Sequence, residues 1–378
     1  MATISKAYKF RIYPNQKQQR QLRLEFAASK KVYNYYLEKS IEFYKENKDN
    51  LEKKSLNYYD WCKDLTLLKK TEEWNWLNQA CSQTMPQTLR DLDSAYKNFF
   101  RRIREGKGGK EIGFPNFKKF NGSVRYSNIC CKYSRENHKI SLSKCGWVKV
   151  IDYKPAYGKL MNMTVSRSKS NNWFVSICVE QEEKIYENLS ESMIGIDVGI
   201  KDFLVDSNGN RISNPKYLNK SSKRLNKLQR QLSKKKIGSN NRKKARVKLA
   251  RQHEIVAEQR KNFLNQNSTN LVKNNKMIAH EDLKVKNMIK NHKLAKSISD
   301  VSWYEFFRML EYKGNWCKCK IVKTGTFEPT SKRCNNCGYV IDKLGLEIRE
   351  WECPNCHVVL DRDVNAAKNI LELGIKGT

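Results

Sequence analysis

The stretch Ile194-Gly-Ile-Asp-Val-Gly199 decides how the second half of the chain folds. Its apolar residues alternate as in a short β-strand, which sends the three branched side chains to one face and Asp197 to the other. Gly195 and Gly199 flank this acid, and we expect such small neighbours to leave room for metal ions and a phosphate beside the carboxylate. Gly-flanked aspartates also occur in turns, so the motif alone marks only a candidate site.

A strongly basic segment follows this strand. Residues 202–210 (DFLVDSNGN) predict a second strand that runs into an Asn-Gly turn. Residues 216–262 then hold 17 Lys and Arg but only 2 Asp and Glu, with leucines at helical spacing on both sides of a turn at 237–241. A charge run is usually a solvated helix face, but an excess of +15 on one helical hairpin favours contact with phosphates. The candidate nucleic-acid-binding residues are Lys234, Lys235, Lys236, Arg242, Lys243, Lys244 and Arg246.

Two later segments also place acids at the ends of predicted elements. Met277-Ile-Ala-His-Glu281 is a short apolar strand that ends on Glu281, and Asp363 lies at the start of a predicted helix with an apolar stripe. Phosphodiester hydrolysis with two Mg²⁺ ions about 4 Å apart needs carboxylates that converge from separate elements. Taken singly, however, Asp363 is better interpreted as a helix N-cap.

Four cysteines have the spacing of a zinc site. The pairs Cys334-Asn-Asn-Cys337 and Cys353-Pro-Asn-Cys356 predict two knuckles that share one tetrahedral Zn²⁺, with the chain between them forming a small hairpin over the metal. We expect a positive φ at Gly338, directly after the first pair. Four thiolates leave no open coordination position, so this zinc would be structural. A redox pair or simple buried thiols are the alternatives.

The remaining composition narrows the class of protein. Lys and Arg number 74 against 39 Asp and Glu, so the formal net charge of +35 indicates a polyanionic partner, most commonly nucleic acid. The chain has no apolar run long enough for a transmembrane helix and no apolar N-terminal signal, so we expect a cytoplasmic protein without a membrane role. Eight further cysteines have no paired spacing and are interpreted as small buried hydrophobes: Cys62, Cys81, Cys130, Cys131, Cys145, Cys178, Cys317 and Cys319.

The first half of the chain combines strands with a helical block. Residues 8–13 alternate apolar and basic side chains and predict a half-buried strand, while residues 16–104 have helical periodicity and many aromatics. Most of these aromatics are expected to pack between helices, and some could stack on bases. A Gly-rich break at 105–113 precedes a predicted hairpin of 163–165 and 173–179. These features indicate a β-barrel-like domain that is interrupted by a helical insertion.

The order of these pieces resembles the TnpB family of transposon-encoded RNA-guided nucleases, which are relatives of miniature type V CRISPR effectors. The order is a strand Asp, a basic helical hairpin, a strand Glu, a zinc ribbon and then DRDVNAAKNIL, which begins at Asp361. The resemblance extends to four further segments: KAYKFRIYPN (6–15), GFPNFKK (113–119), WYEFFRMLEYK (303–313) and FEPTSKRCNNCG (327–338). It is weakest between residues 37 and 82.

The resemblance implies an α+β multidomain protein. It implies a β-barrel (wedge) domain at 1–20 and 113–190 with a helical recognition insertion at 21–112. An RNase H-like RuvC α/β nuclease domain would follow at 191–326, with the basic hairpin at 216–275. A zinc ribbon at 327–358 would be inserted before the third RuvC motif at 359–378.

The resemblance also implies a site and an activity. In the family, three carboxylates bind two Mg²⁺ ions, and they match Asp197, Glu281 and Asp363; Asp361 remains an alternative for a metal-binding or supporting role. The family's guide RNA comes from the transposon end and directs cleavage of double-stranded DNA beside a short adjacent motif. We expect one RNA on a monomer, in a prokaryotic cytoplasm and at the nucleoid when DNA is bound. An RNA-guided repressor that does not cleave, a guide-free RNase H-like transposase and a structural RNA-binding protein are the rival functions.

Overall fold

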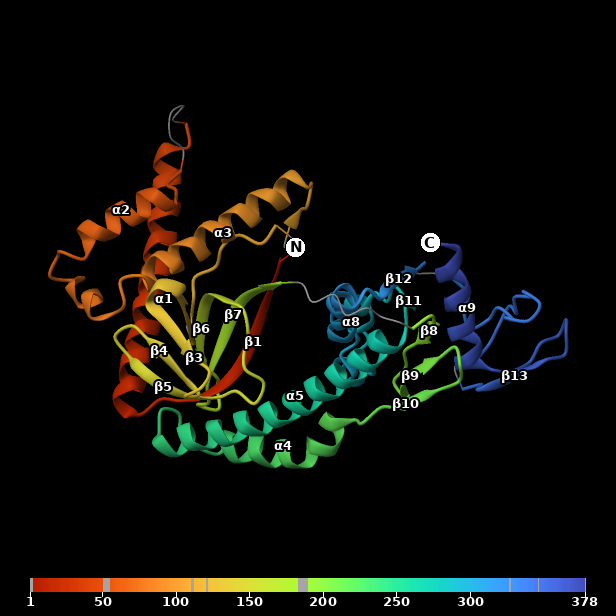
Figure 1. Cartoon of the computed structure of the whole chain (residues 1–378). Helices are drawn as coiled ribbons and strands as arrows, with labels where there is room; N and C mark the ends of the chain where they lie inside the picture. The colour runs from red at the N-terminus through yellow and green to blue at the C-terminus, as the bar shows by residue number, and fades with distance from the viewer. Residues whose placement is uncertain are drawn as a thin grey trace. The chain divides into compact units, whose positions relative to one another are not determined.

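The computed structural model describes residues 3–49, 55–109, 112–119, 122–182, 190–325, 328–345 and 347–377. The chain forms two compact units, Met1–Glu183 and Lys184–Thr378, which are described separately below (Figure 1). Within the described residues, none of the helices combines the length and apolar character needed to cross a lipid bilayer.

The first unit contains a seven-stranded antiparallel sheet with the order β2-β6-β7-β1-β5-β4-β3. Its long strands bury every second side chain, as the alternation in β7 shows, and these side chains form an apolar core. The strands are β1 (Thr3–Tyr13), β2 (Ser123–Ser127), β3 (Cys131–Ser134), β4 (Lys139–Leu142), β5 (Gly146–Ile151), β6 (Lys159–Arg167) and β7 (Trp173–Glu182). The predicted first strand and the predicted hairpin are therefore confirmed, and both are longer than expected.

This sheet curls back on itself. Strands β2 and β3 stand at opposite ends of the strand order, yet only the short 3-10 helix η3 (Asn128–Cys130) connects them. Four residue steps span at most about 14 Å, so the two ends of the sheet must lie close together. Strand β3 also contacts β6, the neighbour of β2. The sheet thus has a barrel-like curvature, although in the described residues no ladder joins β2 to β3.

Helices occupy the predicted insertion between β1 and β2. They are α1 (Gln16–Asn47), α2 (Tyr58–Leu68), the 3-10 helix η1 (Asn75–Gln79) and α3 (Thr84–Arg104). Helix α1 begins at a capping box formed by Asn15 and Gln18. Most aromatics of this block pack against each other, with Trp61 and Tyr36 fully buried, whereas Tyr59 is 79% exposed. The interpretation of these aromatics as packing residues is therefore largely confirmed.

The second unit is built on a five-stranded mixed sheet with the order β10-β9-β8-β11-β12. Its strands are β8 (Met193–Asp197), β9 (Asp202–Asp206), β10 (Arg211–Ser213), β11 (Met277–Glu281) and β12 (Lys320–Thr324). Strands β8, β11 and β12 are parallel neighbours, whereas β9 pairs antiparallel with both β8 and β10, so β10 runs in the same direction as β8. Parallel strands end at the same edge of a sheet, so the acids that end β8 and β11 lie side by side.

The helices of the second unit surround this sheet. They are α4 (Tyr217–Ser233), α5 (Asn240–Asn274), α6 (Val285–Met288), α7 (Ala295–Val301), α8 (Trp303–Cys317) and α9 (Arg362–Lys376). Helices α4 and α5 form the predicted basic hairpin, with Leu225, Leu249 and Val256 buried along its apolar seam. A separate two-stranded sheet of β13 (Glu350–Glu352) and β14 (Val359–Asp361) precedes α9.

Helix α9 lies directly on strand β8, and this contact corrects one expectation. A Cβ atom at Gly195 would stand 2.0 Å from the Ala367 carbonyl oxygen and 2.6 Å from the Leu371 backbone nitrogen. The space beside Gly195 is therefore filled by the backbone of α9 and is not left open for metal ions or a phosphate. At Gly199, a Cβ would meet the Asp202 carbonyl oxygen at 2.8 Å, so that space is filled as well.

We predict that Gly195→Ala destabilises the second unit by about 3 kcal/mol. The added methyl group collides with backbone atoms of α9, which cannot move without a shift of the helix. Chemical denaturation monitored by fluorescence measures the effect. Gly108→Ala is the matched control, since a Cβ at Gly108 meets no atom within 4 Å. Equal stability of the two variants would contradict the tight packing of α9 on β8.

Candidate acidic active site and zinc centre

The three predicted acids meet at one cleft of the second unit. Asp197 ends β8, Glu281 ends β11, and Asp363 lies in the first turn of α9. All three line the same cleft, whose volume is about 700 Å³. The alignment of β8 with β11 pairs Ile196 with His280, so the next residue on each strand brings Asp197 and Glu281 to the same level.

The structure separates the roles of the two aspartates at the start of α9. Asp361 is the N-cap residue, since its Oδ1 accepts a hydrogen bond of 2.9 Å from the backbone nitrogen of Val364. Asp363 lies two residues inside the cap, and its carboxylate faces the cleft with 18% of the side chain exposed. The N-cap alternative considered for Asp363 is therefore wrong, because Asp361 fills that position.

Two arginines contact Asp363 from different elements. Arg349, in the segment before β13, lies 3.2 and 3.3 Å from the two carboxylate oxygens. Arg211, on β10, lies 3.5 Å from Asp363 and also forms an ion pair of 2.5 Å with Asp361. These guanidinium groups offset part of the negative charge, and their fixed donors are well suited to phosphate oxygens.

The electrostatic environment of Asp197 is that of a crowded carboxylate. Burial and the neighbouring charges of Glu281 and Asp363 raise the pKa of Asp197 to about 8. Hard oxygen ligands of this kind suit Mg²⁺, which is commonly held by one or two carboxylates and several waters. A divalent cation would relieve the repulsion among the three acids, so these residues fit the ions that the sequence implied.

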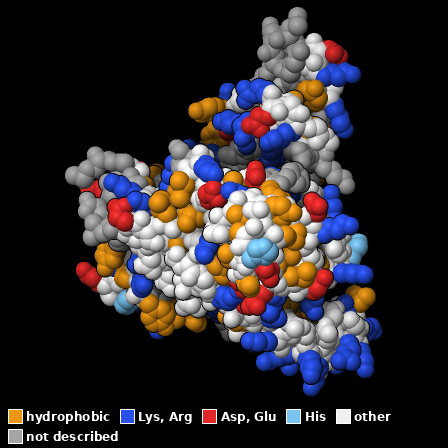
Figure 2. Space-filling view, turned by 90° about the vertical axis from the view of Figure 1, so that its right-hand side faces the viewer, with side chains coloured by type: hydrophobic (Ala, Val, Ile, Leu, Met, Phe, Trp, Pro, Cys, Tyr) orange, Lys and Arg blue, Asp and Glu red, His pale blue; other side chains and the backbone are white. Residues whose placement is uncertain are grey.

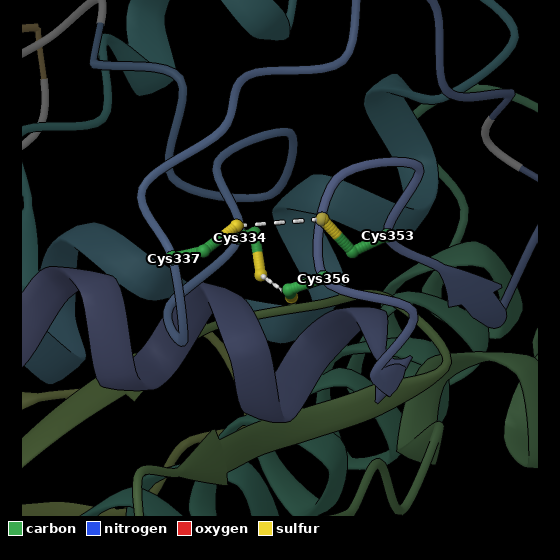
Figure 3. A group of neighbouring side chains, drawn as sticks. All are labelled: Cys334, Cys337, Cys353 and Cys356. Atoms are coloured by element: carbon green, nitrogen blue, oxygen red, sulfur yellow. Dashed lines mark hydrogen bonds between the residues drawn. The ribbon is translucent and has the colours of Figure 1, made fainter.

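Four sulfur atoms converge in the predicted zinc site (Figure 3). The Sγ atoms of Cys334 and Cys356 are 3.7 Å apart, those of Cys337 and Cys353 are 3.6 Å apart, and all four lie within 4.8 Å of one another. A tetrahedral zinc with Zn–S bonds of about 2.3 Å places its sulfurs about 3.8 Å apart. The four cysteines therefore have the chemistry and the spacing of a structural zinc centre.

The two knuckles repeat the same backbone pattern. The amide of Gly338 donates to the Cys334 carbonyl at 2.9 Å, and the amide of His357 donates to the Cys353 carbonyl at 2.9 Å. Gly338 has the predicted positive φ of 80°, and His357 takes the equivalent position with φ 58°. In the described residues, the chain between the two knuckles forms no ladder of the kind expected for the predicted hairpin. Each knuckle instead lies at the turn of its own pairing: β13 with β14, and a bridge between Arg333 and Val340.

Hydrogen bonds prepare part of this site for metal binding. The Asn355 side chain and the Tyr339 backbone lower the pKa of Cys337 to about 6, and the Asn336 side chain lowers the pKa of Cys356. A lowered pKa favours the thiolate, which is the form that binds zinc. None of the twelve cysteines, all of which lie in described residues, is in a disulfide bond, and four of the eight outside this site are buried.

The predicted nucleic-acid-binding residues surround the turn of the α4–α5 hairpin. Figure 2 shows Lys and Arg side chains gathered at the bottom of the view, the level of α4 and α5 in Figure 1. Arg242 differs from the others, because its guanidinium donates to the carbonyls of Leu232 and Lys235 and so closes the end of α4. The other six are exposed and, in the part of the chain that the structure describes, form no ion pair: Lys234, Lys235, Lys236, Lys243, Lys244 and Arg246.

Several residues at the acidic cleft were not identified from the sequence. Thr330 donates its hydroxyl proton to Glu281, and Arg211 and Arg349 contact Asp363. Thr330 lies in the quoted 327–338 motif, whose first residue, Phe327, falls outside the described residues. The signal available for Thr330 was its position four residues before Cys334. The sequence around the two arginines contains no comparable signal.

Comparison with solved structures identifies the fold class. A structure of a Cas12f1–sgRNA–target DNA complex matches with a TM-score of 0.58 at 14% identity, covering 97% of this chain and 98% of that one. A mini-RNA-guided endonuclease, CRISPR-Cas_phi3, matches with a TM-score of 0.54 at 10% identity over 99% of this chain and 93% of that one. The α+β fold with mixed sheets is thus that of miniature effector proteins.

Sequence comparison identifies the family. A protein of Streptomyces pristinaespiralis, named as a candidate RNA-guided DNA endonuclease, is 37% identical over 99% of this chain and 90% of its own length. InsQ of Escherichia coli K12, named in the same way, is 33% identical over 97% of this chain and 92% of its own length. A TnpB-like protein of Acanthamoeba polyphaga mimivirus is 25% identical over 97% of this chain and 73% of its own length. The chain belongs to the TnpB family.

Three family models match separate parts of the chain. OrfB_IS605, described as "Probable transposase", covers residues 176–292, and a model described as "Cas12f1-like, TNB domain" covers residues 303–370. A model described as "Helix-turn-helix domain" matches residues 1–49. The described part of that last segment contains the strand β1 and the single long helix α1. These described residues therefore form no helix-turn-helix motif.

We predict that the purified chain retains one zinc ion and that Cys353→Ser loses it, with destabilisation of the region around β13 and β14, because zinc binding and local folding are coupled at such sites. Elemental analysis of the protein measures the zinc content. Cys178→Ser, a change in β7 far from this cluster in sequence, should keep the zinc. Folded wild-type protein without zinc would contradict the prediction.

We predict that Asp197→Asn stabilises the protein in magnesium-free buffer, and more so at pH 8 than at pH 5. Folding raises the pKa of Asp197 from an ordinary value of 3.8 to about 8, so the folded state binds this proton more tightly than the unfolded state does. The wild type therefore loses stability as the pH rises from about 4 to about 8, and asparagine does not titrate. Because a tenfold change in proton affinity corresponds to about 1.4 kcal/mol, the gain at pH 8 should be on the order of several kcal/mol.

Urea denaturation at both pH values measures this difference in the free energy of unfolding. Glu350→Gln, at an exposed acid of β13, is the control and should show no comparable gain between pH 5 and pH 8. An Asp197→Asn variant that is no more stable than the wild type at pH 8 would show that the three carboxylates do not repel one another as described.

Proposed function

We propose that this chain is an RNA-guided DNA endonuclease that cleaves double-stranded DNA by two-Mg²⁺ phosphodiester hydrolysis. The observation that carries the proposal is the meeting of Asp197, Glu281 and Asp363 at one cleft, where burial and the two neighbouring carboxylates raise the pKa of Asp197. Such a cluster destabilises the protein without a cation, and proteins commonly accept this cost at functional sites.

The relatives support the nucleic-acid partners. Two of them, at 37% and 33% identity over nearly the whole chain, are named as candidate RNA-guided DNA endonucleases. The Cas12f1 structure with the same fold is a complex with an sgRNA and a target DNA. For this chain we propose a guide RNA from the transposon end, cleavage beside a short adjacent motif, and a monomer that carries one RNA.

We propose the following division of labour among the domains. The curled sheet, from 1–20 and 113–190, is the wedge barrel, and the helices of 21–112 are its recognition insertion. The mixed sheet of 191–326, with the hairpin 216–275, is an RNase H-like RuvC domain that 359–378 completes. The ribbon at 327–358 is inserted before the third acid, between β12 and α9.

In this proposal the three acids would hold the divalent cations. When bound, the cations would neutralise negative charge at the scissile phosphate and lower the pKa of a bound water. The chain itself supplies the positive groups that orient the DNA backbone. Lys201, Lys216 and Arg362 line the cleft beside the acids, as does Arg349. Fixed cations of this kind bind phosphate oxygens and hold the scissile bond near the carboxylates. Asp361 has a supporting role as the cap of α9.

The α4–α5 hairpin is proposed as a backbone-binding surface. Its exposed lysines have no acidic partner among the described residues, so their charge is available to phosphates. Binding through many such contacts releases counterions and is therefore strongly salt-dependent. Arg242 is expected to contribute less, because its donors already bind the carbonyls at the end of α4.

The test is cleavage of matched and unmatched DNA by protein expressed with or without the non-coding region beside its gene. We predict cleavage only with a co-purified RNA and a matching target, since sequence recognition resides in base pairing. Asp197→Ala, Glu281→Ala and Asp363→Ala should each abolish cleavage but retain nucleic-acid binding, because affinity depends on many Lys and Arg contacts.

Asp361→Asn is the matched control. Asparagine keeps the N-cap hydrogen bond and removes the charge, so this variant should still cleave. Loss of cleavage in Asp361→Asn, together with normal cleavage in Asp363→Ala, would reassign the third acid. Matched binding without any cleavage by the wild type would favour the repressor function, and equal cutting of unmatched DNA by RNA-free protein would favour a guide-free nuclease or transposase.

A further inference from the structure

Thr330 connects the zinc-bearing segment to one of the three acids. Its hydroxyl group donates a hydrogen bond to Oε1 of Glu281, and its side chain is 6% exposed. The two residues are far apart in sequence, because Glu281 ends β11 and Thr330 lies four residues before Cys334. This buried donor fixes one oxygen of the Glu281 carboxylate.

Two asparagines of α9 hold the backbone of the same segment. The Asn369 amide group donates to the carbonyl oxygens of Thr330 at 2.7 Å and Arg333 at 2.6 Å. Asn365 donates to the Arg333 carbonyl at 2.8 Å and accepts from the backbone nitrogen of Asn335 at 2.9 Å. Both asparagines are buried, with exposed fractions of 0% and 1%, so loss of either would leave carbonyl or amide groups without a partner.

These bonds connect three parts of the site. Asn335 lies inside the first zinc knuckle, directly after Cys334. Asn365 and Asn369 lie two and six residues after Asp363 on α9. A two-point ion pair of 3.0 and 3.2 Å between Arg333 and Glu372 strengthens the same contact. The position of Thr330 is therefore set jointly by the zinc knuckle and by the helix that carries the third acid.

We propose that Thr330 is a positioning residue for Glu281, and that Asn369 of α9 acts on Glu281 through Thr330. The proposal rests on the proposed function of the acidic cleft, since it assigns Glu281 to a cation site. A hydroxyl group on Oε1 orients the carboxylate and leaves Oε2 for a cation. Partners that orient a metal-binding carboxylate typically contribute 10–100-fold in metal affinity or activity.

The structure offers a closely matched control residue. Thr324 ends β12, pairs with Glu281 across the parallel ladder and is 8% exposed, close to the value for Thr330. In the described part of the chain, however, the Thr324 hydroxyl makes no hydrogen bond. Thr→Val at either position therefore removes one buried hydroxyl with little change of shape, but only at Thr330 does it remove a bond to Glu281.

The experiment measures Mn²⁺ binding to the full-length chain by electron paramagnetic resonance, with binding that is absent from Asp197→Ala assigned to the cleft. We expect Thr330→Val to weaken this binding about 10-fold or more. Thr330→Ser keeps the donor and should bind within about 2-fold of the wild type, as should Thr324→Val. Thermal melting of each variant accompanies the titration.

Asn369→Ala tests the second part of the proposal. This change should weaken Mn²⁺ binding in the wild-type background but have little further effect in Thr330→Val, because both act on the same carboxylate. Independent, additive losses would overturn the action of Asn369 through Thr330. Wild-type Mn²⁺ affinity in Thr330→Val would overturn the positioning role alone. Absence of any Asp197-dependent Mn²⁺ binding in the wild type would overturn the cation site itself, and with it the proposed function.

Discussion

The close approach of helix α9 to strand β8 at Gly195 is the constraint on which the second unit depends. At this point the two backbones touch, and any side chain at position 195 would push the helix away. Asp363 is carried by the first turn of that helix and Asp197 by the end of that strand. The distance between helix and strand therefore sets the distance between two of the three acids. A glycine at position 195 serves the site indirectly, by allowing α9 to lie on the sheet.

Such closeness creates an electrostatic cost that the surrounding residues offset only in part. Arg349 and Arg211 contact Asp363, and the hydroxyl of Thr330 contacts Glu281. Burial raises the pKa of Asp197, the nearby charges of Glu281 and Asp363 raise it further, and Arg362 offsets only part of this rise. A cleft that holds acids together against their repulsion is already arranged for cations. Repulsion among the acids lowers the free energy of unfolding. Proteins keep such destabilising groups where the groups perform a function.

The sequence predicted the elements of this site better than the connections between them. Alternation and helical spacing located the strands that end on Asp197 and Glu281, the basic hairpin and the helix after Asp361, because these patterns depend on residues close together in the chain. The cysteine spacing located the four cysteines that converge, for the same reason. Patterns of this kind show which face of an element is buried but not what covers it. The contacts of Gly195 with Ala367, of Thr330 with Glu281 and of Arg211 with Asp361 join distant segments, so the expected room beside Gly195 proved to be filled by α9.

The place of the zinc ribbon in the chain follows from the same geometry. A long segment separates the end of β12 from α9, and the start of α9 must nevertheless return to the edge where β8 and β11 end. Bringing the two ends of such a segment together costs conformational entropy. A metal bound by the four cysteines would cross-link the segment and so reduce this cost. The buried asparagines then fix the first knuckle against α9 itself, near the third acid. A ribbon attached elsewhere on the surface could still bind zinc. Placed here, the four-cysteine segment also hydrogen-bonds to Asn365 and Asn369 of α9, the helix whose first turn carries Asp363.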